Sequence, residues 1–332
     1  MTTAARPGVA YVFPGQGAQA VGMGADLFDR SSAARDVFAT ANAAVGEDLA
    51  ALCFHGPAEA LRPTRVQQPA VVAASLAAFA AFSEALGSEH TALGDGHAIP
   101  VAALAGHSVG LWAAVAVGGS LDIHTTMAMV ATRGAAMQQA AGRRPGRMSA
   151  VLGLDPELTE SVVGEIRARI PGSYLSVANI NTPGQVVVGG DLASLGELPA
   201  AAKAAGARRV VPLEVSGAFH TAAMLPARDT MRERLLAAPL VDPRAPVIAN
   251  MDGQPLRTAA ELRVELAEHV AAPLQWWRGV GTLVALGVTH IVEFGHKGLL
   301  TSMLRRTGQD VSLLNVYDAD SADAAAKELR NV

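Results

Sequence analysis

Several features that mark common protein classes are scarce in this 332-residue chain. Aromatic residues make up only 4% of it, and the single cysteine is Cys53. One cysteine excludes an intrachain disulfide framework and a Cys-x-x-Cys metal pair. Cys53 lies in the apolar run "ALCF" with no activating neighbour, so its thiol is expected to be packed in the core rather than to be catalytic.

An excess of charge of one sign is also lacking. Lysine and arginine number 26 against 30 aspartate and glutamate residues, and the net charge is −4. This balance excludes the strongly basic character of a typical nucleic-acid-binding protein. The apolar run at 9–13 is too short for a signal peptide or a membrane span, and no other segment is expected to reach that length without charges or glycines. The sequence therefore predicts a cytoplasmic protein without a nucleic-acid or membrane partner.

What is present favours an α/β protein in two parts. Half of the residues are hydrophobic, which is ample for a packed core. Buried strands that alternate with helices are predicted at 9–13, 99–105 and 290–294. From 142 to 211 the order changes to β-α-β-β-α-β, which matches a ferredoxin-like unit. We therefore expect a large α/β domain with a parallel sheet, 1–141 and 212–332, interrupted by a small α+β domain, 142–211.

The stretch "YVFPGQGAQAVGMG", residues 11–24, contains the pattern G-x-G-x-x-A of a dinucleotide-binding turn. A dinucleotide fold also needs a second strand that ends in an acidic residue about 20 positions later. The segment that follows, 25–44, instead predicts a helix of mixed polarity. The glycines are therefore expected to serve another purpose than binding a pyrophosphate.

The stretch "AGHSVGLWAAV" places Ser108 in G-x-S-x-G between a predicted strand and a predicted helix. This is the context that a nucleophile elbow needs, because the flanking glycines allow a strained turn. The first free N–H groups of the helix then lie beside the serine and can stabilise an oxyanion. The pattern favours Ser108 as a nucleophile.

A nucleophilic serine needs a base, and nine histidines are available. His220 is the best candidate, because it lies in a glycine-containing loop, "VSGAFH", between a predicted strand and a predicted helix. His290 and His296, near the last predicted strand, remain alternatives.

Arg133 lies on the apolar face of a helix that is predicted to begin after Asp122, with Met137 one turn further along. A guanidinium on such a face needs an anionic partner. That partner is either an aspartate or glutamate within the fold, or a carboxylate of the substrate held by the guanidinium fork. The sequence leaves both possibilities open.

Taken together, the motifs resemble the malonyl-CoA:acyl-carrier-protein transacylase family. The resemblance rests on "FPGQGAQAVGMG", "GHSVG", "TRGAAMQ", "VANINTPGQVVVGG", "SGAFH" and "PLQWW", which occur in this order along nearly the whole chain. It implies a large α/β-hydrolase-like domain interrupted by a ferredoxin-like small domain.

The resemblance also implies roles for individual residues. Ser108 would be the nucleophile that becomes malonylated, and His220 the general base and then the general acid. Arg133 would pair with the free malonyl carboxylate. The main-chain N–H groups of Gln16 and Val109 would form the oxyanion hole, so the "PGQG" glycines would bring an N–H against a thioester oxygen.

Three further residues are assigned to the substrate site in the same way. Phe219 resembles the bulky residue that favours malonyl over larger branched acyl groups. Met137 is expected to line the site beside Arg133. His269 aligns with a glutamine of the family whose main-chain carbonyl helps to orient the catalytic histidine.

The implied reaction is a ping-pong transfer from malonyl-CoA to an acyl carrier protein, for fatty acid or polyketide synthesis, by a monomer that needs no cofactor and no metal. An acyl-thioester hydrolase and a transacylase subunit of a malonate-processing complex are the alternatives. Three departures from the family pattern suggest a specialised member. Leu111 replaces an acidic residue, His269 replaces the glutamine, and "GHKG" at 295–298 replaces a more usual "GPGK".

Overall fold

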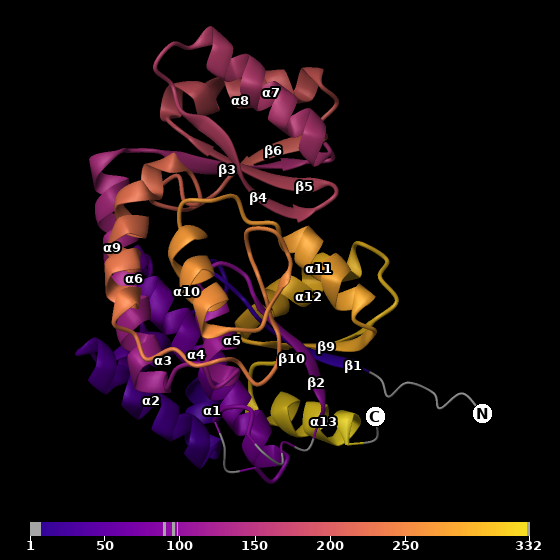
Figure 1. Ribbon diagram of the computed structural model, residues 1–332. Helices are drawn as coiled ribbons and strands as arrows, with labels where there is room; N and C mark the ends of the chain where they lie inside the picture. Colours follow the sequence, from indigo (N-terminus) through magenta and orange to yellow (C-terminus); the bar gives the residue numbers. More distant parts are fainter. Residues whose placement is uncertain (1–7, 89–90, 95–96, 98, 331–332) are drawn as a thin grey trace.

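The computed structural model describes residues 8–88, 91–94, 97 and 99–330 (Figure 1). The larger of its two sheets has the order β10-β9-β1-β2-β7-β8. The first five of these strands pair in parallel, and only β8 is antiparallel to its neighbour. The six strands are β1 (Gly8–Phe13), β2 (Val101–Gly106), β7 (Val247–Ile248), β8 (Pro255–Leu256), β9 (Val288–Phe294) and β10 (Ser312–Val316).

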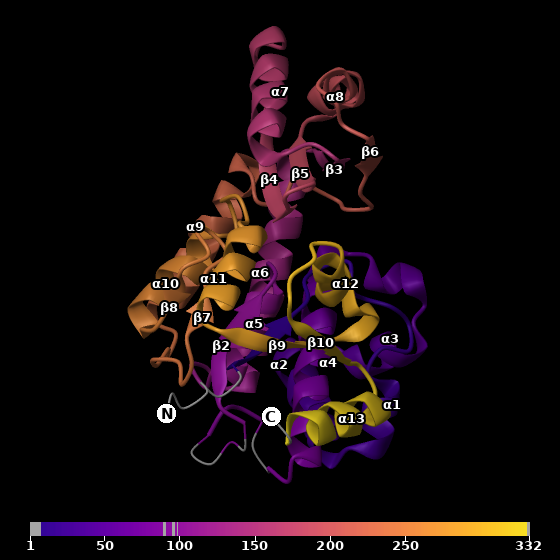
Figure 2. The ribbon, with the colours of Figure 1, turned by 90° about the vertical axis from the view of Figure 1, so that its right-hand side faces the viewer.

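Helices surround this sheet in both views (Figures 1 and 2). They are α1 (Ala25–Arg30), α2 (Ser32–Val45), α3 (Leu49–His55), α4 (Thr64–Ala85), α5 (Gly110–Val117), α6 (Ile123–Arg143), α9 (Leu225–Leu236), α10 (Ala259–Glu268), α11 (Trp276–Ala285), α12 (Leu299–Arg305) and α13 (Ala319–Leu329). Short 3₁₀ turns lie at Ala58–Leu61, Ala222–Met224 and His296–Gly298. The main hydrophobic core forms between these helices and the sheet.

A second, four-stranded sheet has the order β4-β5-β3-β6, and all of its pairs are antiparallel. Its elements are β3 (Arg147–Leu152), α7 (Pro156–Arg169), β4 (Leu175–Thr182), β5 (Gln185–Gly190), α8 (Leu192–Ala204) and β6 (Arg209–Pro212). Figures 1 and 2 show this sheet at one end of the molecule, with α7 and α8 on the side away from the larger sheet. The unit has an apolar core of its own.

The pairing of β1 with β2 brings two loops together. Phe13 is in register with Gly106, so both strands end at the same edge of the sheet. The N–H of His107 continues the ladder by donating to Phe13 O at 2.9 Å. Gly110, at the start of α5, packs so closely that an added Cβ would lie 2.2 Å from Phe13 O. The loop after β1 and the turn after β2 therefore lie side by side.

The structure corrects the sequence in several places. The helix expected at 25–44 is two helices, because Ser31 is extended and its Oγ accepts the Ala34 N–H at 3.1 Å as an N-cap. The prediction that α6 begins after Asp122 is confirmed, since that carboxylate caps the helix. Strand β10 and helix α13 were not expected at all.

The expectation that no other segment reaches the length of a membrane span without charges or glycines was also wrong. Within the described residues, α4 meets both criteria, and no charge falls between Val66 and Ser83. The apolar window of α4 is wholly buried inside the protein. Its apolar character is therefore explained by its place at the centre of the helical core.

Replacing Gly110 with alanine should disrupt the contact between α5 and β1. The added methyl group would overlap main-chain oxygens, which cannot move without displacing the sheet edge, so we expect a loss of about 3 kcal/mol or more in the free energy of unfolding. Urea denaturation would measure it.

Gly164, within α7, is the matched control. A Cβ there meets nothing within 4 Å, so Gly164→Ala should gain about 0.5–1 kcal/mol. Similar stabilities for the two alanine variants would contradict the close approach of α5 to β1.

Candidate active site

Ser108 occupies a strained turn between β2 and α5. Its φ is +54°, in the left-handed region that non-glycine residues rarely adopt. The Ser108 N–H donates to Asn250 Oδ1 at 2.8 Å, and Asn250 Nδ2 donates to Gly106 O at 2.8 Å. One amide side chain thus clamps the turn on both sides. These bonds hold a backbone conformation that would otherwise be unfavourable.

The hydroxyl of Ser108 meets the ring of His220. Ser108 Oγ and His220 Nε2 lie 2.8 Å apart, and His220 Nδ1 lies 2.7 Å from the main-chain oxygen of His269. A carbonyl oxygen only accepts, so Nδ1 carries the ring proton. Nε2 therefore presents its lone pair to the Ser108 hydroxyl, as a general base requires.

Burial and the nearby charge of Arg133 lower the pKa of His220 from 6.5 to about 3. His220 is consequently neutral at pH 7 and able to take a proton. The alternatives for the base lie elsewhere: His290 Nδ1 bonds to Thr289 Oγ1 at 2.9 Å, and the ring of His296 packs against Tyr317.

Arg133 is fully buried, and its guanidinium lies beside the Ser–His pair. It donates from Nη1 to Gln68 Oε1 at 2.6 Å and from Nη2 to Ser108 Oγ at 3.1 Å. Nη2 also lies 3.3 Å from His269 Nε2, and Nε has no partner. No aspartate or glutamate among the described residues forms an ion pair with it. Of the two partners that the sequence left open, an aspartate or glutamate of the fold is therefore not found among the described residues.

The uncompensated cation has an electrostatic cost. Burial lowers the pKa of Arg133 to about 9, so the group is still charged at pH 7. A buried cation with only neutral partners, one N–H unsatisfied and a serine hydroxyl 3.1 Å away is well placed to receive an anion bound at Ser108.

Gln68, on α4, is a site residue that the sequence analysis missed. Its Oε1 accepts from Arg133, while its Nε2 lies 3.3 Å from the sulfur of Met137. The sequence offered one signal, two successive glutamines at the start of an otherwise apolar helix. Met137 is 1% exposed, and Phe219, next to His220 in the chain, is 5% exposed in the main core.

The loop after β1 approaches the elbow closely. A Cβ on Gly15 would lie 2.5 Å from His107 O, so only glycine permits this contact. Lys297, in the "GHKG" departure, donates to Gln19 O at 3.0 Å and ties the same loop to the end of β9. Gln16 therefore lies in a loop that is held against the turn at Ser108. Its main-chain N–H is the candidate oxyanion donor of this loop.

The second candidate donor is the N–H of Val109. The Ser108 N–H is occupied by Asn250, so it is not available for an oxyanion. Val109 directly precedes α5, whose N-terminal N–H groups carry the positive end of the helix dipole. Leu111, the apolar residue that replaces an acidic one, is fully buried in the core.

The small sheet reaches the site through β4. Asn181 Oδ1 lies 3.0 Å from His107 Nε2, and both side chains are buried. The main chain of β4 also joins Leu274, since Ile180 N donates to Leu274 O at 2.8 Å. The elbow thus lies at the junction of the two sheets, where a substrate can be held between them.

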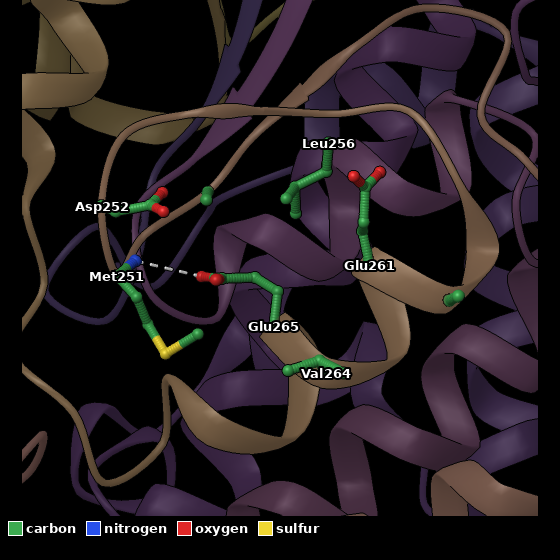
Figure 3. A pocket seen from close by; sticks show the side chains of 8 residues that line it. Met251, Asp252, Leu256, Glu261, Val264 and Glu265 are labelled. Carbon is green, nitrogen blue, oxygen red and sulfur yellow. Dashed lines mark hydrogen bonds between the residues drawn. The ribbon is translucent and has the colours of Figure 1, made fainter.

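The C-terminal end of α10 supports the turn at Ser108 through Asn250. Glu265 Oε1 accepts the N–H of Asn250 at 2.6 Å. It also accepts the N–H of Met251 at 3.2 Å (Figure 3). Burial raises the pKa of Glu265 to about 7. The neighbouring pocket, about 400 Å³, is lined by residues of α10 and the β7–β8 turn and not by Ser108, His220 or Arg133.

Among the described residues no group of three or more His, Cys, Asp or Glu side chains could hold a metal ion. Cys53 is buried, and burial raises the pKa of its thiol to about 12, as expected for an inert core residue.

Comparisons with known proteins follow the same lines. The sequence matches the family model described as "Acyl transferase domain" over residues 10–327. The "Malonyl CoA-acyl carrier protein transacylase" of Escherichia coli (strain K12) is 36% identical over 320 residues, which cover 96% of this chain and 99% of that protein.

Two solved structures are similar over the whole fold. The malonyl CoA-acyl carrier protein transacylase of Coxiella burnetii superposes with a TM-score of 0.89 at 29% identity. The match covers 98% of this chain and 98% of that one. A type II PKS acyl-carrier protein in complex with its malonyl-transacylase has a TM-score of 0.89 at 33% identity, over 97% of this chain and 99% of that one.

The pKa of His220 predicts an unusual pH profile. Acylation of Ser108 needs neutral His220 and is lost as pH falls through the pKa of that ring, so the acid limb should lie well below pH 6.5. Arg133→Met removes a cation that lowers this pKa, and should move the limb to higher pH. The position of the acid limb is measured from the rate at which an uncharged ester acetylates Ser108 at each pH, followed by mass spectrometry. Arg65→Met, which removes an exposed ion pair, is the control. If the acid limb of the pH profile lies at the same pH in Arg133→Met and in wild type, Arg133 does not lower the pKa of His220.

Glu265 should make stability depend on pH. Its folded pKa exceeds its ordinary value of 4.5, so wild type should lose up to about 3 kcal/mol of unfolding free energy as pH rises from about 4.5 to about 7. Glu265→Gln keeps an acceptor without a charge and should not show this loss, whereas Glu265→Ala should be destabilised at every pH. Parallel pH curves for wild type and Glu265→Gln in urea denaturation would refute the assignment.

Proposed function

Because the chain belongs to the acyl transferase family, we propose that it transfers the malonyl group of malonyl-CoA to the phosphopantetheine thiol of an acyl carrier protein. The observation that carries this proposal is the contact of Ser108 Oγ with both His220 Nε2 and Arg133 Nη2. It joins a nucleophile, a base and a cation at a single oxygen atom.

The first half-reaction follows from the proton positions. His220 takes the Ser108 proton at Nε2 as Ser108 Oγ attacks the thioester carbonyl, and His269 O stabilises the Nδ1–H of the resulting imidazolium. The N–H groups of Gln16 and Val109 receive the negative charge of the tetrahedral intermediate. Each such donor is typically worth about 3–4 kcal/mol.

Collapse of the intermediate completes the first half-reaction: His220 returns its proton to the departing CoA sulfur, which leaves malonyl esterified to Ser108. In the second half-reaction the carrier-protein thiol enters, His220 takes its proton, and its sulfur attacks the malonyl carbonyl. Ser108 Oγ then leaves and receives the proton back from His220, which restores the free enzyme. The same residues thus act in both directions, as a ping-pong mechanism requires.

Selection of the acyl group is assigned to Arg133. A malonyl carboxylate would satisfy the buried guanidinium, whereas an acetyl group would leave it uncompensated at a cost of roughly 2–5 kcal/mol. Phe219, Met137 and the imidazole of His269 complete the proposed substrate site. The buried position of Phe219, beside the base, supports a site that is closed to larger branched acyl groups.

The arrangement of the two sheets supports the domain assignment. The order β4-β5-β3-β6, with α7 and α8 on one face, is that of a ferredoxin-like unit, and we assign residues 142–211 to it as a small domain inserted in the α/β-hydrolase-like domain, 1–141 and 212–332. The observed last turn of α6 and the end of β6 lie within a few residues of these limits. We further propose that the protein acts in the cytoplasm as a monomer.

Ser108→Ala should abolish the covalent intermediate. Wild type mixed with malonyl-CoA should gain one malonyl group by intact-protein mass spectrometry, and the variant none, because the variant lacks the hydroxyl that lies against His220 Nε2 and beside Arg133. Ser312→Ala, on strand β10, is the control. A malonyl adduct that persists on Ser108→Ala would exclude Ser108 as the nucleophile, and rapid loss of the wild-type adduct to water without a thiol would favour a hydrolase.

Arg133→Ala should separate malonyl from acetyl transfer. We expect kcat/KM to fall for malonyl-CoA by roughly a hundredfold or more relative to acetyl-CoA, because only malonyl loses a charged partner. Steady-state transfer to a carrier protein measures both, with Arg65→Ala as the surface control. Equal losses for the two thioesters would exclude a role for Arg133 in carboxylate recognition.

A further inference from the structure

His269 has two separate contacts with the reaction centre. Its main-chain oxygen accepts from His220 Nδ1, whereas its ring lies against the guanidinium of Arg133, with Nε2 3.3 Å from Nη2. The first contact needs no particular side chain. The second depends on the imidazole, so the identity of residue 269 bears on Arg133. The same ring also lies beside that of His220, with 6.1 Å between the ring centroids, so a test must separate acyl selectivity from the overall rate.

The tautomer of His269 follows from its position at the end of α10. Glu265 O, in the last turn of the helix, accepts the main-chain N–H of His269 at 3.1 Å, and His269 Nδ1 lies 2.7 Å from the same oxygen. Nδ1 must therefore donate, which leaves Nε2 as a lone pair that faces Arg133. Burial and the charge of Arg133 lower the pKa of His269 well below 6.5, so the ring stays neutral.

The environment of Arg133 gives this lone pair its importance. Nη1 is held by Gln68, and Nη2 has two hydrogens, one towards Ser108 Oγ and one towards His269 Nε2. The Ser108 contact weakens when Ser108 carries an acyl group, because an ester oxygen accepts a hydrogen bond less well than a hydroxyl oxygen does. Gln68 and His269 then remain as the two acceptors that fix the plane of the guanidinium. A planar fork binds a carboxylate well only when it is held in one orientation.

We propose that the imidazole of His269 is a specificity-determining acceptor that orients Arg133 towards a carboxylate-bearing acyl group on Ser108. It acts through Arg133 and is thus a positioning residue. The inference rests on the proposed malonyl transfer, which it deepens by assigning a part of the acyl selectivity to a residue outside the Ser–His pair.

The test compares three substitutions at one position. His269→Leu removes the acceptor, His269→Asn is polar but ends short of Arg133, and His269→Gln restores an acceptor of similar reach. All three keep the main-chain carbonyl that holds His220. We expect the ratio of malonyl to acetyl kcat/KM to fall by roughly tenfold in the Leu and Asn variants, the size of one lost hydrogen bond to a charged group, and to recover in the Gln variant.

His290→Leu, at a half-buried position in β9 that pairs with Val9 and Ser312, is the control and should keep the wild-type ratio. An unchanged ratio in both the Leu and Asn variants, or equal losses for malonyl and acetyl, would overturn the inference, since a merely structural role affects both thioesters alike. Should the Leu variant not fold, the Asn and Gln pair carries the comparison. Failure of the Gln variant to recover the ratio would also contradict it.

A second readout does not depend on activity. The side-chain ¹⁵N–¹H signals of Arg133 should be resolved in wild type and His269→Gln, because two acceptors restrict the guanidinium, and averaged in His269→Leu. If wild type accepts no malonyl group but shows resolved Arg133 signals, the proposed function is refuted, whereas the contact between His269 and Arg133 is still supported. Averaged signals in wild type would refute the contact itself.

Discussion

The active-site arrangement depends on one costly feature, a fully buried guanidinium with only neutral partners. Arg133 has Gln68, Ser108 and His269 around it and one unsatisfied N–H. Burial of an uncompensated charge destabilises a fold unless a partner arrives, so the site is built for a ligand with an anionic end. The same charge holds His220 neutral, since it is a main cause, after burial, of that ring's lowered pKa. In the proposed mechanism, the selection of the acyl group and the neutral state of His220 thus both depend on Arg133.

The C-terminal end of α10 joins these functions mechanically. Glu265 fixes Asn250, which clamps the turn at Ser108, while its own carbonyl fixes the ring of His269. His269 then holds His220 through its main chain. Two residues one helical turn apart therefore position Ser108 and His220, and the second does so through its main-chain carbonyl at the end of the helix. A shift of this helix end would disturb all of these contacts together.

Local sequence patterns made much of the fold and part of the site predictable. Contacts between residues far apart in the sequence could not be predicted in this way. The family resemblance is confirmed, and so are the parallel-rich α/β sheet and the helix after Asp122. The "GHSVG" turn could be placed because strand, glycine and helix signals are adjacent. The contacts of Gln68 and Asn250 could not, because their partners are 65 and 142 residues away and include main-chain atoms. The break at Ser31 was missed although a serine there is a normal N-cap, since the apolar pattern continues through it.

A structure of the malonylated enzyme tests the central claim most directly, namely that Arg133 is buried in order to receive a carboxylate. The account predicts a malonyl ester on Ser108 whose carboxylate oxygens lie within hydrogen-bond distance of the Arg133 guanidinium, with the Ser108–Arg133 contact weakened. A malonyl carboxylate that points to solvent, with Arg133 still bound only to its neutral partners, would contradict it.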